Sequence, residues 1–234
     1  MKSLLLLEKE LRKHATAERA RVSVRYFKTG KGEYGEGDQF LGVAVPFQRA
    51  LAAKYAAQVT DADISDLLFS PYHEIRLTAL FMLNTRFLKS ADQAEAKKWV
   101  DFYLSHIHCI NNWDLVDSSA PIVLGTWLQN RDRRILYQFA RSKNLWKNRI
   151  AILSTLAFIR KNELDDLLKL AEIFIHHPHD LLHKATGWML REGWKRNPQV
   201  IEAFLTKFAS QMPRTMLRYS IEKMSPTKKK RFMK

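Results

Sequence analysis

The sequence predicts an all-α protein, an α-solenoid of HEAT-like helical repeats with a concave basic groove. First, the eight glycines and seven prolines of this 234-residue chain fall mostly between segments whose apolar residues recur every three to four positions. Second, related helical segments recur at a spacing in the mid-thirties. Third, basic residues are in large excess and spread through the chain. No stretch shows the alternation that is typical of a strand.

Helices are predicted one after another along the chain, with short connections between them. Their expected ranges are 2–14, 16–28, 46–58, 61–69, 72–87, 92–106, 112–129, 131–142, 145–160, 163–176, 180–195, 197–209 and 213–223. The exception is segment 29–38, which holds four of the eight glycines. We interpret it as a flexible connection rather than a phosphate cradle, because it lacks the Gly-Lys-Ser/Thr ending and the preceding strand of a nucleotide-binding loop.

The repeats are visible in the second helix of successive helix pairs. Segments 74–80, 147–153, 183–188 and 216–221 share a basic residue followed by small and apolar positions, and these basic residues are Arg76, Arg149, Lys184 and Arg218. The gaps are 73, 35 and 34 residues, and half of the first, 36.5, places a missing member at the helix that contains Trp113 and Asp117. Such a period with two helices per unit indicates an α-solenoid of HEAT or TPR type. A solenoid that repeats a basic residue on its concave surface would offer a positive groove to a duplex.

One domain is expected over residues 1–234. It divides into N-terminal helices with the Gly-rich connection (1–45), repeats (46–224) and a basic tail (225–234). No run of about 18 apolar residues suggests a membrane span, and Leu4–Leu7 is too short for a secretory signal. The single Cys109 excludes an intramolecular disulfide and a multi-cysteine zinc site. We therefore expect a cytoplasmic protein.

The charge indicates a polyanionic partner. The chain has 39 Lys and Arg against 24 Asp and Glu, a net charge of +15. Nucleic acid is the commonest soluble polyanion, although an anionic membrane surface would attract the same charge. The cluster Lys228–Arg231 with Lys234 is compatible both with a solvated tail and with nonspecific attraction to phosphates.

The stretch 111–121, Asn-Asn-Trp-Asp-Leu-Val-Asp-Ser-Ser-Ala-Pro, is the strongest candidate site. On a helix, Trp113 and Asp117 project from one face about a turn apart, and an aromatic plane beside an anion favours a cation. Pro121 has no N–H for the carbonyl group of Asp117, so a helix through both should be kinked. The alternative is a core aromatic beside a surface acid. Asp114 fits the role of a helix-capping acid and is left out of the site.

Four groups of residues together resemble the AlkD-like DNA alkylation repair glycosylases, which are HEAT-like repeat proteins. They are 25–28 (Arg-Tyr-Phe-Lys) with 40–43 (Phe-Leu-Gly-Val) and Pro46; 113–117 (Trp-Asp-Leu-Val-Asp); 145–149 (Leu-Trp-Lys-Asn-Arg) with 151–153 (Ala-Ile-Leu); and 184–192 (Lys-Ala-Thr-Gly-Trp-Met-Leu-Arg-Glu). The resemblance covers essentially the whole chain, and the Gly-rich segment is longer than in family members. It implies that Asp117 is the catalytic carboxylate and that Trp113 and Trp188 stack on the damaged nucleotide. It also implies that Arg149 holds the phosphodiester backbone and that Tyr26 lies against the same nucleotide.

The chemistry of such a reaction follows from the substrate. Alkylation of a purine at N3 or N7 makes the base cationic and weakens the glycosidic bond, so the sugar moves toward an oxocarbenium ion. One carboxylate, Asp117, would then stabilise the sugar cation and orient water, while Trp113 and Trp188 would each favour the cation by about 0.5 to 2 kcal/mol. The resemblance implies that the base is not flipped into a pocket. No lysine nucleophile is indicated, so we expect a monofunctional alkylpurine DNA glycosylase that initiates base excision repair.

The expected partner is double-stranded DNA containing alkylated purines. We expect a monomer with no metal, organic cofactor, membrane or obligate protein partner.

Several residues are compatible with two interpretations. The basic residues are either phosphate contacts or solvated helix positions, namely Lys147, Lys184, Arg191 and Arg218. Arg149 fits an interhelical ion pair as well, and Gly187 marks either a close helix contact or room for a sugar. The His176–His179 run lacks the partners of a metal site. The alternative function is a non-catalytic protein that binds distorted DNA and does not need Asp117; a protein-interaction scaffold would not use the charge.

Overall fold

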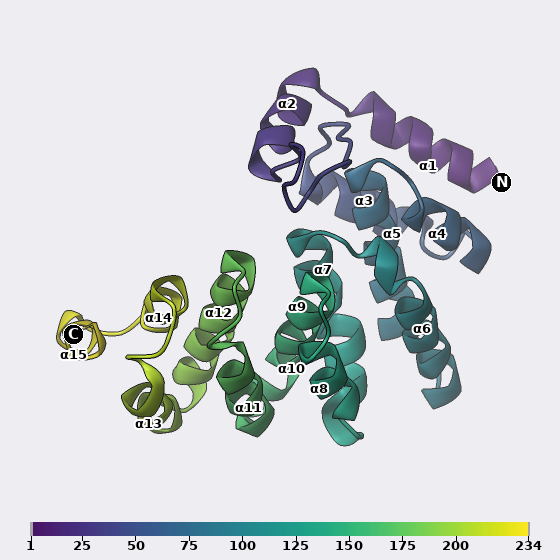
Figure 1. Ribbon diagram of the computed structural model, residues 1–234. Coiled ribbons are helices and arrows are strands. Elements are labelled where there is room, and N and C mark those ends of the chain that lie inside the picture. The colour runs from purple at the N-terminus through teal and green to yellow at the C-terminus, as the bar shows by residue number, and fades with distance from the viewer. Residues whose placement is uncertain (1, 234) are drawn as a thin grey trace. The chain divides into compact units, whose positions relative to one another are not determined.

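The computed structural model describes residues 2–233, and within this range it is helical with no β-strand (Figure 1). The prediction of an all-α fold is confirmed. Gln39 and Tyr72 form an isolated parallel bridge. The chain forms two compact units, Met1–Ser119 and Ala120–Lys234. No helix in the described part of the chain is long and apolar enough to cross a bilayer.

The first unit contains seven α-helices and a short 3-10 turn among its described residues. They are α1 (Lys2–Lys13), α2 (Ala17–Tyr26), α3 (Val45–Tyr55), α4 (Asp61–Leu68), α5 (His73–Leu88), α6 (Gln93–Ser105), η1 (Ile107–Cys109) and α7 (Trp113–Ser119). Helix α5 is central, because α3, α4, α6 and α7 all pack against it. Its buried positions include polar side chains, among them His73, Glu74 and Arg76. Buried polar groups must find partners, and these three organise the site described below.

The chain after the Gly-rich segment is fastened to α5 by Glu74. This buried carboxylate accepts hydrogen bonds from the backbone N–H groups of Leu41 (2.9 Å), Gly42 (2.7 Å) and Val43 (3.3 Å). Gly42 has a φ of +81°, and a Cβ atom there would lie 2.1 Å from the carbonyl oxygen of Thr16. Only glycine fits this turn, which brings residues 38–44 along α5.

The Gly-rich segment, interpreted from the sequence as a flexible connection, is folded by hydrogen bonds in the structure. The N–H groups of Gly30 and Gly32 donate to the carboxylates of Glu33 and Glu36 within the segment (2.9 and 2.8 Å). The buried Gly35 donates to the carbonyl oxygen of Lys28 at 3.1 Å. These bonds fold the segment into successive turns that end at Asp38.

The predicted helix 112–129 is interrupted at Pro121, where the sequence predicts a kink. Helix α7 ends at Ser119, and a π-helical turn, η2 (Pro121–Gly125), follows. In this turn the N–H of Gly125 donates to the carbonyl oxygen of Ala120, five residues back, at 2.9 Å. Proline has no N–H to continue the α-helical ladder, which explains the change of pitch. The boundary between the two compact units falls at this interruption.

The second unit is helical as well. After η2 it contains η3 (Leu128–Asn130), α8 (Arg134–Ala140), α9 (Leu145–Ser154), α10 (Leu156–Ile159), α11 (Asp165–Phe174), α12 (Asp180–Arg196), α13 (Pro198–Phe208), α14 (Arg214–Ser220) and α15 (Pro226–Phe232). The predicted helix 145–160 is therefore two helices. Helix α12 packs against both α9 and α14, as the predicted series of second helices requires. In the first unit, α5 lies in the same way between α3 and α7. HEAT-like repeats and the concave groove remain predictions.

Gly187 lies at a close contact between α12 and α14. A Cβ atom at this position would be 2.5 Å from the carbonyl oxygen of Met216 and 2.5 Å from the Cβ atom of Tyr219. Of the two interpretations of Gly187, the close helix contact is therefore observed. The space beside it is filled by α14.

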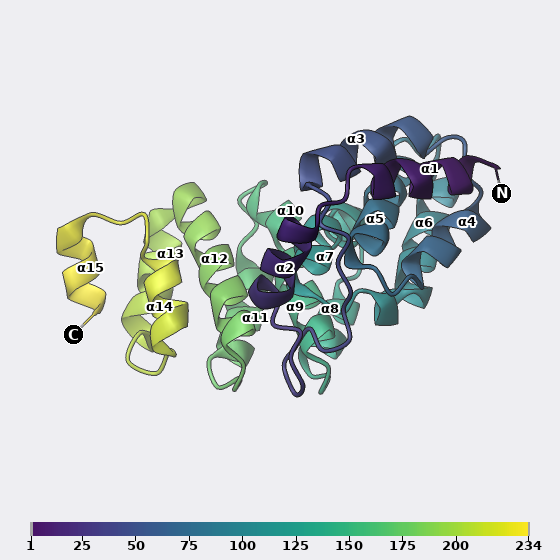
Figure 2. The same ribbon diagram turned by 90° about the horizontal axis from the view of Figure 1, so that it is seen from above.

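The predicted basic tail forms a helix over most of its length. Ser225 caps α15 by accepting a hydrogen bond from the N–H of Lys228, and Phe232 is buried. Lys228 donates to Glu202 at 2.5 Å, and α15 lies beside α13 and α14 in both views (Figures 1 and 2). Of the two interpretations of the cluster Lys228–Arg231, a frayed tail does not fit, because Pro226–Phe232 is helical. Lys234 lies outside the described residues.

Candidate functional site

Helix α7 presents the predicted pair Trp113 and Asp117 one turn apart. Both side chains are half-buried. The helix begins directly after Asn112, which is fully buried and whose side-chain oxygen accepts a hydrogen bond from the N–H of Trp113 at 2.8 Å. Val116 closes the first turn by donating to the carbonyl oxygen of Asn112 at 3.2 Å. The start of α7 is thus fixed by a side chain that the sequence analysis did not select.

An aromatic cluster surrounds Trp113 and joins the C-terminal end of α2 to α7. The ring of Tyr26, 63% exposed, meets the indole edge to face at a centroid distance of 5.7 Å. Phe27 lies nearly parallel to the indole at 5.2 Å and 14°, and it stacks at 5.0 Å on Phe40. The structure therefore brings Tyr26 and Trp113 together. Phe27 covers part of one face of the indole, while the Tyr26 ring beside it is exposed.

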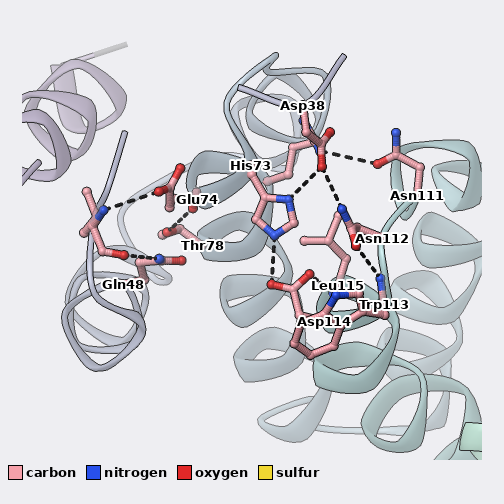
Figure 3. A network of polar contacts seen from close by, with 12 residues as sticks. Asp38, Gln48, His73, Glu74, Thr78, Asn111, Asn112, Trp113, Asp114 and Leu115 are labelled. Carbon is pink, nitrogen blue, oxygen red and sulfur yellow. Dashed lines mark hydrogen bonds and ion pairs between the residues drawn. The ribbon is translucent and has the colours of Figure 1, made fainter. Parts of the chain in front are cut away.

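A buried histidine that contacts this cluster lies between two carboxylates (Figure 3). His73, 2% exposed, places Nδ1 at 2.9 Å from Asp38 Oδ2 and Nε2 at 2.8 Å from Asp114 Oδ2. Its ring also contacts Phe27 at 4.7 Å and Phe40 at 4.9 Å. Burial lowers the pKa of His73, but the hydrogen bonds to Asp114 and Asp38 outweigh it and raise the pKa to about 9. The imidazole is therefore a cation at neutral pH.

Asp38 connects the Gly-rich segment to three other elements. Besides His73, it accepts hydrogen bonds from Arg76 (2.5 Å) and from the side chain of Asn112 (2.9 Å). Burial raises the pKa of Asp38, yet the hydrogen bond from His73 and the nearby Arg76 guanidinium hold it below its ordinary value of 3.8. Two carboxylates, Asp38 and Asp114, thus face two cations, His73 and Arg76, so the buried charges balance.

The treatment of Asp114 as a capping acid needs correction. One of its oxygens does accept the N–H of Leu115 at 2.9 Å, but the other holds His73. Sequence analysis also missed Asp38 and His73. These residues lie 35 positions apart, and neither spacing nor residue type links them in the sequence. Locally, His73 stands between Tyr72 and Glu74 at the start of a helical segment, and nothing in this stretch identifies its partners.

Helix α2 exposes a basic surface next to Tyr26. Of its residues 17–26, all of which are described, none is buried. Arg21 and Arg25 are one helical turn apart and exposed, and Val22 and Val24 are 62% and 42% exposed. A helix that buries so little and carries cations is suited to a polyanion. The sequence analysis selected neither arginine.

In the second unit, Trp188 on α12 is half-buried and its Nε1 donates to Glu192 at 3.2 Å. It lines a shallow surface pocket of about 240 Å³ together with Leu156, Ile159, Arg160, Glu192 and Arg196. One edge of the indole is thus accessible within this unit.

The predicted basic contacts differ in their exposure. Arg149 is buried, 5% exposed, and donates to the carbonyl oxygen of Leu181 at 2.5 Å, which links α9 to α12. Arg76, another basic residue of the repeat pattern, is buried as well. The inference that these recurring residues make an exposed basic surface is therefore wrong at positions 76 and 149. A phosphate contact by Arg149 remains a prediction.

The other four basic residues are at least partly accessible. Arg218 is exposed at the end of α14, and Lys147 is half-buried near the Phe139 ring at 5.9 Å. Lys184 pairs with Asp180 at 2.8 Å. Arg191 pairs with Glu222 and, at 3.5 Å, with Glu192. A phosphate at Arg191 would have to compete with two carboxylates.

The His176–His179 run contributes to helix capping. The N–H of His179 donates to Nδ1 of His177, and Nδ1 of His179 accepts the N–H of Leu181, both at 3.1 Å. Within residues 2–233, no group of three or more His, Cys, Asp or Glu side chains is arranged to hold a metal ion.

The comparisons with known proteins identify the family of this chain. The family model of the DNA alkylation repair enzymes matches residues 7–224. The chain therefore belongs to the DNA alkylation repair enzyme family, and it is an enzyme of DNA repair whose substrate is DNA. A solved structure from Enterococcus faecalis, described as a predicted DNA alkylation repair enzyme, has the same fold. Its TM-score is 0.70 at 18% identity, over 91% of this chain and 98% of that one. A search of curated proteins finds no match.

Proposed function

We propose that this protein is a monofunctional DNA glycosylase that hydrolyses the N-glycosidic bond of cationic N3- and N7-alkylated purines in duplex DNA. Its product would be an abasic site, which initiates base excision repair. The observation that carries the proposal is the combination on α7 of a carboxylate, Asp117, and an indole, Trp113, one turn apart beside the exposed ring of Tyr26. The family membership and the net charge of +15 support DNA as the substrate.

In the proposed reaction the substrate supplies most of the driving force. The alkylated base is already cationic, so it leaves with little or no protonation, and the deoxyribose develops oxocarbenium character. Asp117 would stabilise that positive charge and orient the attacking water. The faces of Trp113 and Trp188 would favour the cationic nucleotide, and Tyr26 would lie against it. Because the leaving group needs no metal or redox chemistry, we expect no cofactor.

The binding of DNA is proposed to be mainly electrostatic. The exposed Arg21 and Arg25 of α2 would contact phosphates near Tyr26, and Arg218, Lys147, Lys184 and Arg191 would do so from the second unit. Arg149 would hold the backbone at the lesion. Recognition through sugar and backbone would leave the damaged base unflipped, and bulky adducts are compatible with it. We expect a cytoplasmic monomer without an obligate protein partner.

The test is base release from duplexes that contain N7-methylguanine or N3-methyladenine. Asp117→Asn should lower the single-turnover rate by about 100-fold or more while DNA affinity is retained. Asp101→Asn is a matched control, because Asp101 is an exposed acid of the same unit that pairs with Lys97 on α6. The rate at which Asp101→Asn releases the alkylated base should equal that of the wild type.

The same assay separates the alternative function. A wild-type protein that binds damaged DNA in a salt-sensitive way but releases no base would be a non-catalytic binder of distorted DNA. Such a binding function would use the positive charge of the protein and would not need Asp117. Equal rates for the wild type and Asp117→Asn would remove the carboxylate from the mechanism.

A further inference from the structure

The buried ion cluster beneath the aromatic rings brackets Trp113 on both sides along the chain. On one side, Asp38 accepts a hydrogen bond from Asn112, whose own oxygen accepts the N–H of Trp113. On the other side, the same Asp38 reaches Asp114 through His73, with contacts of 2.9 and 2.8 Å (Figure 3). The residues before and after Trp113 are therefore both tied to one carboxylate of the Gly-rich segment.

His73 supports the side chain of Trp113 as well as its backbone. The imidazole contacts Phe27 at 4.7 Å, and Phe27 stacks on the indole at 5.2 Å. Phe40 covers the imidazole at 4.9 Å and 23°. A chain of ring contacts thus runs from His73 through Phe27 to Trp113. A shift of His73 would be transmitted to the indole by two routes.

With Asp38 and Asp114 both ionised, His73 must be an imidazolium. An ionised carboxylate only accepts hydrogen bonds, and a neutral imidazole has a single N–H. Both ring nitrogens of His73 contact a carboxylate, so both must donate. The charged groups that face the ring are Asp38 from the Gly-rich segment, Asp114 from α7, and Arg76 of its own helix through Asp38.

His73 is 2% exposed, so it does not touch a substrate. We propose that His73 is a positioning residue, which clamps the start of α7 between Asp38 and Asp114 and so holds Trp113 and Asp117 in the orientation used for glycosidic bond cleavage. This inference rests on the proposed glycosylase function. It also assigns a role to the Gly-rich segment, which supplies the second carboxylate of the clamp.

The kinetic test uses His73→Phe, which keeps a ring against Phe27 and Phe40 but removes both donors. We expect a single-turnover rate of base release about 10-fold or more below that of the wild type, because small displacements of reacting groups are costly. DNA affinity, which depends on exposed cations, should stay close to that of the wild type. His106→Gln is the matched control, since His106 is a half-buried histidine of the same unit that contacts Ser65 and Phe102 outside the clamp.

A second variant distinguishes positioning from a general loss of stability. Asp38→Asn removes one anion beside His73, so the imidazolium should lose its proton at a lower pH than in the wild type. The alkaline limb of the rate profile should therefore move to lower pH in Asp38→Asn. A merely structural role would lower the amount of folded enzyme without moving this limb.

The clamp can also be observed without activity, which separates its failure from that of the proposed function. Fluorotryptophan-labelled protein gives one fluorine resonance per indole, and Trp113→Phe identifies the one from Trp113. This resonance should shift as His73 loses its proton, shift at lower pH in Asp38→Asn, and not titrate in His73→Phe. A Trp113 resonance that is the same in the wild type and in His73→Phe at every pH would overturn the inference, as would an unchanged rate of base release.

Discussion

Replacing His73 by Gln should remove a pH-dependent part of the stability of this protein. Glutamine occupies a similar volume and can donate one hydrogen bond, but it carries no charge. In the folded wild-type protein the imidazole lies between Asp38 and Asp114 and is almost fully buried. Its two contacts raise the pKa of His73 from 6.5 to about 9. This difference between folded and unfolded states sets the size of the effect.

The magnitude follows from linkage between protonation and folding. At about 1.36 kcal/mol per pKa unit, a rise from 6.5 to about 9 corresponds to about 3 kcal/mol of extra stability while the imidazole is protonated. Because the folded-state pKa of His73 is the higher one, this stability is fully present below 6.5 and is lost as the pH rises through about 9. Burial raises the pKa of Asp38, but His73 and Arg76 lower it further, so that it lies below 3.8. Asp38 therefore titrates outside this pH window.

The assay is urea unfolding of wild type and His73→Gln between about pH 6 and pH 10, with the free energies of unfolding subtracted at each pH. The subtraction cancels the pH-dependent contributions of titrating groups that both proteins share. One such group is Cys109, whose pKa is raised by burial. The difference should shrink by about 3 kcal/mol across the range, most steeply between pH 7 and pH 9. A difference that is independent of pH would refute the reasoning, since it would mean that His73 is neutral or equally protonated in both states.

Further predictions concern packing and DNA binding. Gly187→Ala should destabilise the protein by about 1 to 3 kcal/mol, measured by denaturant unfolding, because the added methyl group meets the carbonyl oxygen of Met216 and the Cβ atom of Tyr219 at 2.5 Å. An unchanged free energy of unfolding would contradict this, since it would mean that α14 shifts to accommodate the methyl group without cost. Arg21→Ala with Arg25→Ala should weaken DNA binding and reduce the slope of log affinity against log salt by about 2, in a fluorescence anisotropy titration. An unchanged slope would show that α2 does not contact phosphates.

Local sequence signals predicted the helices well where caps and periodicity coincide. The predicted range 61–69 corresponds to α4, Asp61–Leu68, because Thr60 and Asp63 form a capping box. The interruption at Pro121 also follows from one local fact, the missing N–H. Helix α15 was missed because its lysines were read as a charge run. Its start signal, Ser225 followed by Pro226, was nevertheless in the sequence.

Long-range features of the site were not predictable in the same way. Trp113 and Asp117 share one helical turn, so their spacing indicates a common face. The pairing of Tyr26 with Trp113 came from the family resemblance. His73 bonds to Asp38 and Asp114, which lie 35 and 41 residues from it in the sequence. Nor did the sequence indicate that Arg149, expected to hold the phosphodiester backbone, is itself buried and donates to the backbone carbonyl of Leu181.

The parallel contact between Phe27 and Trp113 limits how the indole can meet DNA. A wedge that intercalates between base pairs needs both of its faces, and here one is partly covered by a ring that is itself backed by Phe40 and His73. In the proposed glycosylase, Trp113 would therefore contact a nucleotide with one face only. The edge-to-face ring of Tyr26, at 76° to the indole, makes the second wall of a corner. In the proposed reaction, the sugar cation would lie in this corner without the separation of a base pair.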